Sequence, residues 1–162
     1  MLFQLKFPEN VNVRLLVRQY DPELEDVRSL LVDVCRSVEH SSGRFVVSGF
    51  GQENWPVDIG TDLSVFLEQI PDALGAIESG VETEIDFYEQ GIERVITFTP
   101  CENTYHASCA SRTNWQPDPE VEKIESAHLK QMLIDVRNEF LRMVRMVAPE
   151  LCEHEWIKEW LR

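Results

Sequence analysis

The sequence predicts an α+β fold: an antiparallel sheet of about five to six strands with helices packed mostly on one face. Three observations lead to this fold class. Short stretches alternate apolar and polar residues, as half-buried strands do. Longer stretches repeat apolar residues at helical spacing. Most of the predicted strands follow one another through short turns, which favours antiparallel pairing. The predicted order along the chain is β-β-α-β-α-β-β-β-α-α.

The N-terminal segment predicts a β-hairpin. Residues 2–7 and residues 11–17 each alternate between apolar and polar side chains. Pro8 and Asn10 between them are typical of a turn. We therefore expect these two stretches to pair with each other.

Two helices and a strand are expected next. Asp21 and Pro22 suit the N-cap and first position of a helix, so the first helix is expected to begin there. A strand is expected over residues 44–49. The second helix is expected over residues 61–80 and ends at a glycine, and Pro71 inside it is expected to kink it or split it in two.

The clearest strand pattern lies in the middle of the chain. Residues 81–87 and 92–99 alternate around a short glycine-containing loop, and residues 104–111 add a third strand. We expect this hairpin to lie centrally in the sheet. Four apolar residues are expected to face the helices: Ile85, Phe87, Ile96 and Phe98.

The last third of the chain predicts helices. Apolar residues recur at helical spacing from Val121 to Val147, which indicates one long helix packed across the sheet. Pro149 is expected to end it, and a short final helix is expected to carry Trp156 and Trp160. Trp156 is expected to face the core, whereas the pattern leaves Trp160 open between core and surface.

Length and charge limit the classes of function. The 162 residues fit a single domain spanning residues 1–162. Carboxylates outnumber basic residues by 29 to 15, and the net charge is −14. Such a charge repels nucleic acids and anionic membranes, and it attracts a basic protein. The alternative is that the acidity serves only solubility.

The chain shows no secretory signal and no apolar run long enough to span a membrane, so a cytoplasmic location with free cysteines is expected. Cys35 falls on the apolar side of the first helix and is expected in the core. Cys101, His106 and Cys109 lie close in sequence, but strand alternation separates the last two. No metal and no cofactor are therefore expected.

No motif for catalysis is present. The sequence contains no nucleophile elbow, and Ser48 to Gly51 lacks the lysine of a phosphate-binding loop. With 29 carboxylates, close acidic pairs arise by chance. No enzymatic activity is expected.

Three acidic groups are candidate binding surfaces for a basic partner. Glu82, Glu84 and Asp86 point to one side of a predicted strand, about 6.8 Å apart, although a solvated sheet face explains them equally. The second group surrounds the start of the long helix: Asp118, Glu120, Glu122 and Glu125. The third decorates the final helix: Glu150, Glu153, Glu155 and Glu159.

Tryptophans beside these carboxylates are candidate anchors for a partner. Trp55 and Trp115 fall in proline-containing loops, and Trp160 lies next to Glu153 and its neighbours. For each of them the alternative is a side chain that pins a loop or helix onto the core.

The middle of the chain resembles small immunity proteins of bacterial polymorphic-toxin systems, including those of contact-dependent inhibition. The resemblance rests on residues 87–94 (FYEQGIER), on Phe98 and on residues 109–115 (CASRTNW). It also includes their order: a helix ending in glycine, a hairpin, a meander and a long C-terminal helix, over roughly residues 60–145. It implies a cytoplasmic inhibitor that binds one toxin domain. Such families share no universal functional residues, so the resemblance assigns none.

The acidity is consistent with a basic, nuclease-type toxin as the partner. Two alternatives remain open at this point. One is a small cytoplasmic enzyme, which would show a concave site with a strongly shifted pKa. The other is a structural or assembly subunit, which would show a large exposed apolar patch.

Overall fold

The computed structural model describes all 162 residues and has an α+β architecture. The strands are β1 (Leu2–Lys6), β2 (Arg44–Ser48), β3 (Thr83–Phe87), β4 (Arg94–Cys101), β5 (Thr104–Ser111) and β6 (Val121–Glu125). The helices are α1 (Val27–Val38), α2 (Asp62–Ser79), α3 (Ser126–Val147) and α4 (Glu155–Trp160), with a 3-10 turn at Pro149–Glu153. The predicted fold class is confirmed, but the strands form two antiparallel sheets and not one.

The smaller sheet contains β1 and β2, and the larger has the order β3-β4-β5-β6. Glu122 of β6 links them. One of its carboxylate oxygens accepts a hydrogen bond from the Phe50 N–H, and the other lies 2.7 Å from the amino group of Met1. No backbone ladder connects the two sheets. The Glu122 side chain joins them instead.

The predicted N-terminal hairpin is wrong. β1 pairs with β2, so that Leu2 lies opposite Ser48 and Lys6 opposite Arg44. Residues 9–20 instead run as an extended segment whose only backbone–backbone hydrogen bond joins the Leu15 N–H to the Val147 carbonyl. Their alternation is real, because alternate side chains are half-buried. The alternation indicates which side chains reach the core. It does not determine whether the backbone pairs with another strand, or with which one.

The first helix begins later than expected. Its N-cap is Asp26, whose carboxylate accepts the Arg28 N–H at 2.9 Å. Asp21 instead closes a turn, in which it accepts the Glu23 N–H at 2.9 Å. Both aspartates have the side chain that an N-cap needs. Only Asp26, which directly precedes the helix with the buried apolar residues, starts α1. Cys35 is fully buried in α1, as expected.

Helix α2 runs unbroken through Pro71, so the predicted split does not occur. Proline lacks the N–H that would bond the carbonyl four residues earlier, which is that of Leu67. The indole N–H of Trp160 donates to this carbonyl at 2.9 Å. A side chain from α4 thus replaces the missing helical bond. At its C-terminus α2 ends at Gly80, with φ of 65°, as predicted.

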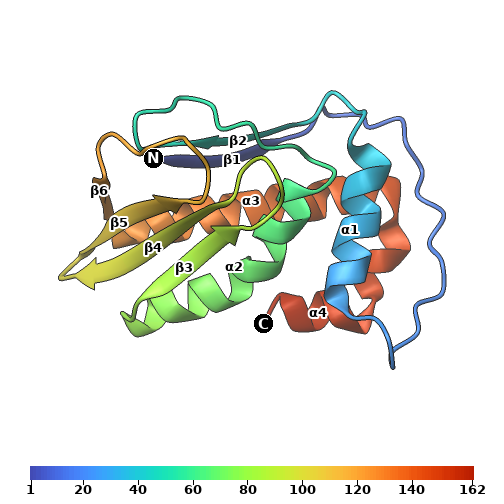
Figure 1. Cartoon of the computed structure of the whole chain (residues 1–162). Coiled ribbons are helices and arrows are strands. Elements are labelled where there is room, and N and C mark those ends of the chain that lie inside the picture. Colours follow the sequence, from blue (N-terminus) through green and yellow to red (C-terminus); the bar gives the residue numbers. More distant parts are fainter.

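The larger sheet buries one face against helices α2 and α3 (Figure 1). Ile85, Phe87, Ile96 and Phe98 are each at most 1% exposed, which confirms the predicted inward face. Strand β3 is an edge strand, however, and not a central one. The Gln69 side chain in α2 caps this edge, because it bonds both the N–H and the carbonyl of Asp86.

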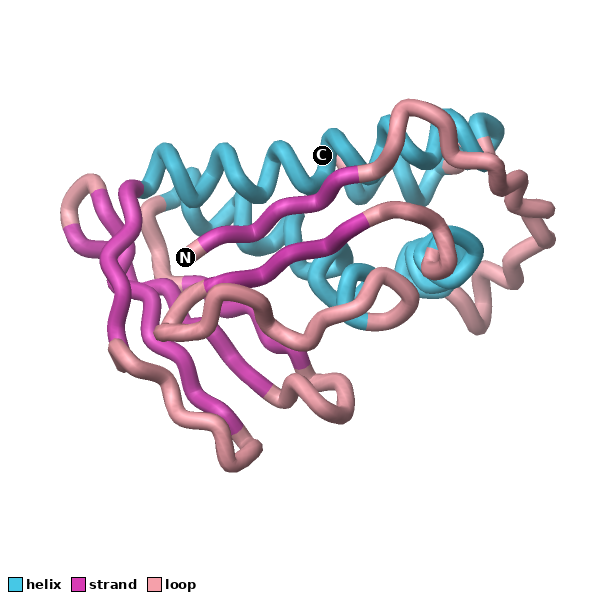
Figure 2. The backbone as a smooth tube through the Cα atoms, turned by 90° about the horizontal axis from the view of Figure 1, so that it is seen from above, coloured by secondary structure: helices cyan, strands magenta, loops and turns pink.

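The start of the long helix is also corrected. Val121 to Glu125 form β6, which pairs with β5 so that Ile124 lies opposite Tyr105. Val121 and Ile124 are three residues apart, a spacing that suits a helix as well as an irregularly buried edge strand. Helix α3 begins at Ser126, and it lies along one side of both sheets (Figure 2).

A continuous cluster of 41 buried residues forms the core and extends from Phe3 to Trp160. It contains side chains from both sheets and all four α-helices. None of the helices is both long enough and apolar enough to cross a lipid bilayer.

Candidate functional site

The acidic row on β3 is only partly free. Glu82 accepts a hydrogen bond from the Thr99 hydroxyl at 2.8 Å, and Asp86 forms an ion pair with Arg112 at 3.2 Å. The other Asp86 oxygen is buried without a hydrogen-bond partner. Glu84 is exposed and has neither kind of partner. Of the three predicted carboxylates, Glu82 and Glu84 are therefore exposed and without an ion pair, whereas Asp86 is neutralised by Arg112.

Three loops meet at one end of the larger sheet: residues 49–61, 88–93 and 112–120. Antiparallel pairing places the end of β3, the start of β4, the end of β5 and the start of β6 at this same end. Figure 1 shows the loops side by side, in teal, yellow-green and orange. Backbone hydrogen bonds join them, from the Asp118 N–H to the Phe50 carbonyl (3.0 Å) and from the Arg112 N–H to the Glu93 carbonyl (2.9 Å).

Gly51 permits the closest approach between two of these loops. Its φ is +80°, and a Cβ there would lie 2.0 Å from the Asp118 carbonyl oxygen. A side chain at position 51 would therefore clash with backbone as well as require a strained conformation. The sequence contains the glycine but gives no indication that the partner loop is more than sixty residues away.

The loops are held together by an arginine between two tryptophans. The Arg94 guanidinium lies 4.5 Å from the Trp55 ring centre and 3.6 Å from that of Trp115. Its Nη1 donates to the Gln52 side-chain oxygen at 2.8 Å, and its Nε is buried without a partner. Arg94 is 4% exposed and has no carboxylate partner, and burial lowers its pKa. The positive charge of Arg94 is therefore stabilised by cation–π contacts with the two indole rings.

This arrangement corrects the prediction for Trp55. Trp55 is 4% exposed and packs against Phe50, Phe87 and Trp115, so it is a core residue and not a free anchor. Trp115 is half-buried and covers the outer side of Arg94. The structure thus brings together the two tryptophans that sequence reasoning chose separately. It also adds Arg94 and Gln52, which that reasoning missed because a lone arginine on a strand carries no signal.

The joined loops contain six carboxylates, none of which forms an ion pair; one of them, Asp58, accepts the Thr61 N–H within its own loop, and the other five project from the loops. We name this surface the acidic loop face, and its residues are Glu53, Glu89, Glu93, Asp118 and Glu120. Three are exposed, and Glu89 and Glu93 are half-buried. Asp118 and Glu120 belonged to the second predicted acidic group. The structure separates them from Glu122, which joins the sheets, and from Glu125 at the far end of β6.

The third predicted group lies on a different part of the chain. Glu153 is exposed and lies 3.4 Å from the Lys158 ammonium, which also contacts Glu155. Trp160 is 5% exposed and belongs to the core, so it is not an anchor for a partner. Trp156, expected in the core, is half-buried and packs against the rings of Tyr20 and His154 in a tilted arrangement. The open choice for Trp160 is therefore decided in favour of the core, and Trp156 is only partly buried against that core.

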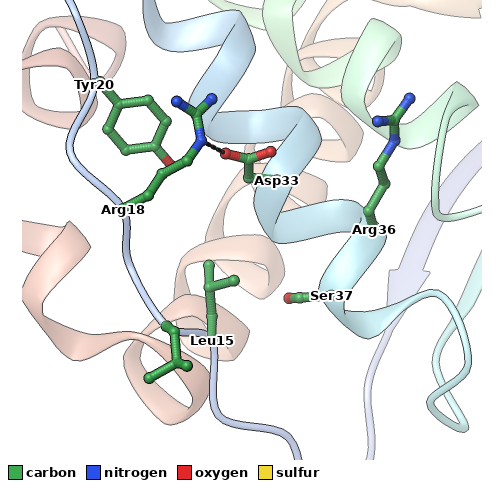
Figure 3. A pocket seen from close by; sticks show the side chains of 7 residues that line it. Leu15, Arg18, Tyr20, Asp33, Arg36 and Ser37 are labelled. Carbon is green, nitrogen blue, oxygen red and sulfur yellow. Dashed lines mark hydrogen bonds and ion pairs between the residues drawn. The ribbon is translucent and has the colours of Figure 1, made fainter.

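A cavity of about 400 Å³ lies between the extended N-terminal segment and α1 (Figure 3). Its polar groups are largely paired. Arg18 bonds Asp33 at 2.7 Å and Glu25 at 2.6 Å, which raises the arginine pKa. Burial and the Asp33 charge raise the pKa of Tyr20 to about 12, so its hydroxyl stays protonated at neutral pH. Leu16 at the rim is 88% exposed. These groups form a fixed polar wall.

All four cysteines are free. Burial raises the pKa of the Cys109 thiol to about 11, although Arg94 opposes the shift, so the thiol is protonated at neutral pH. No three His, Cys, Asp or Glu side chains converge in a geometry that would hold a metal ion. His106 is exposed on the outer face of β5, and Cys109 lies on the opposite face, as strand alternation predicts.

Comparisons with protein-family models, with curated proteins and with solved structures find no match to this chain.

Proposed function

We propose that this chain is an immunity protein, which binds a cognate basic toxin domain and neutralises it by covering the active site or substrate groove. The observation that carries the proposal is the acidic loop face. Five carboxylates without ion-pair partners project from three loops at one end of the sheet, on a chain with a net charge of −14. Half-buried Trp115 lies in one of these loops and supplies an aromatic contact.

The electrostatic argument concerns partner choice and association rate. Unpaired carboxylates on one end of the molecule repel one another, and a basic partner relieves this repulsion. Complementary charge also steers the encounter, and it can raise an association rate constant well above that of neutral surfaces. A toxin that acts on nucleic acid must itself be basic near its substrate groove. Carboxylates of the acidic loop face that enter this groove would compete with the phosphates of the nucleic acid substrate.

The loops that carry these charges are fixed before binding. Arg94 is clamped between Trp55 and Trp115, and the backbone of Phe50 bonds that of Asp118. Ordering a mobile loop costs free energy on association, and a loop that is already ordered avoids that cost. The resemblance of residues 60–145 to immunity proteins of polymorphic-toxin systems supports the same function.

The test uses the toxin domain encoded beside the gene for this chain. In the test variant the five residues of the acidic loop face become Gln or Asn. In a matched control variant five exposed, unpaired carboxylates elsewhere are changed in the same way: Glu9, Glu23, Asp72, Glu150 and Glu159. Both variants have a net charge of −9, because −14 + 5 = −9. They remove the same amount of charge from different places on the chain.

We expect the control to protect cells from the toxin and to bind it nearly as fast as the native chain. The test variant is expected to lose protection, with an association rate at least about tenfold lower and a weaker dependence on salt. Equal effects of the two variants would show that only net charge matters, which would refute this binding surface. No binding of the native chain to the toxin would refute the function.

A further inference from the structure

A second cavity, of about 200 Å³, lies where α2, α3 and the C-terminal residues meet, and we name it the C-terminal cavity. It shares no residue with the acidic loop face. Its lining comes from three elements: Pro71, Leu74, Gly75 and Glu78 of α2, Lys130, Ile134 and Arg137 of α3, and the terminal Leu161 and Arg162. The Trp160 hydrogen bond to Leu67 fixes the terminal residues against α2.

The charge of this cavity is opposite to that of the rest of the chain. Three cationic side chains line it, against one carboxylate, Glu78, which already pairs with Lys130 at 2.9 Å. Carboxylates outnumber basic residues by 29 to 15 overall, yet Arg137 and Arg162 form no ion pair. The Arg137 Nε is buried and has no hydrogen-bond partner. Because this atom is inaccessible to water, a ligand in the cavity would contact the terminal Nη groups of Arg137 instead.

The cavity also has apolar lining residues, which are interspersed with the cationic ones. They are Leu74, Ile134 and Leu161, together with the ring of Pro71. Gly75 lies in the interior of α2, where alanine would favour the helix more. A Cβ at Gly75 would meet nothing within 4 Å, so packing does not require the glycine. Its effect is to leave the cavity open on the side of α2.

We propose that the C-terminal cavity binds a small organic oxyanion, a carboxylate or a phosphate monoester with a short apolar chain. The anionic head contacts the guanidinium groups of Arg137 and Arg162. A guanidinium can form paired hydrogen bonds with a planar carboxylate and with a tetrahedral phosphate. The short apolar chain of the ligand packs on Leu74, Ile134 and Leu161. Small-ligand sites commonly combine apolar contacts with a few polar groups that fix the orientation of the ligand.

The binding test is an NMR titration of the ¹⁵N-labelled full chain at constant ionic strength. The probes are hexanoate and hexyl phosphate, with acetate, inorganic phosphate and chloride for comparison. We expect saturable shifts at the amides of Gly75, Arg137 and Arg162, and tighter binding of the six-carbon probes than of acetate or inorganic phosphate. The stronger of the two six-carbon probes identifies the head group. Shifts that do not saturate, or that spread over exposed cations generally, would overturn the proposal.

Two variants and one control make the result specific. Arg137→Gln removes the unpartnered cation and is expected to weaken binding at least about tenfold. Gly75→Leu fills the open side of the cavity and is expected to abolish binding while the helix is retained. Arg145→Gln removes an exposed arginine from the same helix outside the cavity and is expected to leave affinity unchanged. If Arg137→Gln and Arg145→Gln weaken binding of the probes equally, only the net charge of the protein matters, and the proposed site is refuted.

Discussion

The indole N–H of Trp160 donates a 2.9 Å hydrogen bond to the carbonyl of Leu67, the helical partner that Pro71 cannot satisfy. The two residues are 93 positions apart. The bond explains two features together. Helix α2 passes through a proline without a break, and the last helix of the chain docks on α2 at that proline.

The first prediction is that the cost of losing this bond depends on Pro71. Trp160→Phe leaves the buried Leu67 carbonyl unpaired and also removes packing volume, so we expect a loss of about 2–4 kcal/mol in the free energy of unfolding. In a Pro71→Ala background, the alanine N–H satisfies the carbonyl, and the same change is expected to cost about 1 kcal/mol less. Urea denaturation of the four proteins measures the coupling. Equal costs in both backgrounds would contradict this account of the proline.

The second prediction concerns Asp62, which is 4% exposed at the start of α2. Burial raises its pKa to about 6, with a further contribution from the Asp58 charge, whereas the Asp58 N–H hydrogen bond opposes the shift. The folded state therefore holds a proton that the unfolded state has already released between about pH 4 and pH 6. The stability that Asp62 contributes is present below pH 4 and is lost as the pH rises through 6.

Asp62→Asn removes this titration and keeps an oxygen for the Asp58 N–H. We expect the free energy of unfolding of the variant to increase relative to that of the native chain as the pH rises from about 4 to 8, by up to about 3 kcal/mol. Denaturation at a series of pH values measures the difference between the two stability curves. A difference that is flat with pH, or that has the opposite slope, would show that Asp62 is ionised in the folded state at pH 5.

The third prediction concerns Gly51, whose backbone lies against that of Asp118. Gly51→Ala places a Cβ where the Asp118 carbonyl lies and requires a positive φ that alanine disfavours. We expect a loss of about 2 kcal/mol or more in thermal stability measurements. Gly91→Ala is a suitable comparison, because Gly91 also has a positive φ of +100° but a Cβ there meets nothing within 4 Å. If the two changes cost the same, the loop contact contributes nothing beyond backbone strain.

Local patterns predicted the parts of the fold that local physics decides. The alternation of residues 81–87 and 92–99 identified both strands and their buried faces, and Gly80 marked the end of α2. Residues 11–17 alternate equally clearly but form no strand, because strand pairing is a long-range choice that alternation does not encode. For the same reason, the division into two sheets could not be read from the sequence.

The candidate site divides in the same way. Asp118, Glu120 and Trp115 were candidates from the sequence, which also identified acidity as the leading feature, whereas Glu53, Glu89 and Glu93 were missed. The contacts that hold the site together could not be read from the sequence, because Gln52 and Trp115 lie in two separate loops and Arg94 lies at the start of β4, and they meet only in the fold. The pattern also left the burial of Trp160 open and overestimated that of Trp156, since a short amphipathic helix can dock in more than one rotation.

The last prediction concerns Arg94, which is buried between two indole rings without a carboxylate partner. A guanidinium is planar and weakly hydrated, so it stacks on both rings and still bonds Gln52, whereas a lysine ammonium is compact and strongly hydrated. Arg94→Lys therefore keeps the cost of burying a charge and loses most of what offsets it. Arg94→Met loses the same contacts but also removes that cost. We expect lysine to be the more destabilising of the two, with a loss of about 2 kcal/mol or more by urea denaturation. If Arg94→Lys proves as stable as the native chain, the stack has no energetic role, and the loops must be held by Gly51 and the backbone bonds alone.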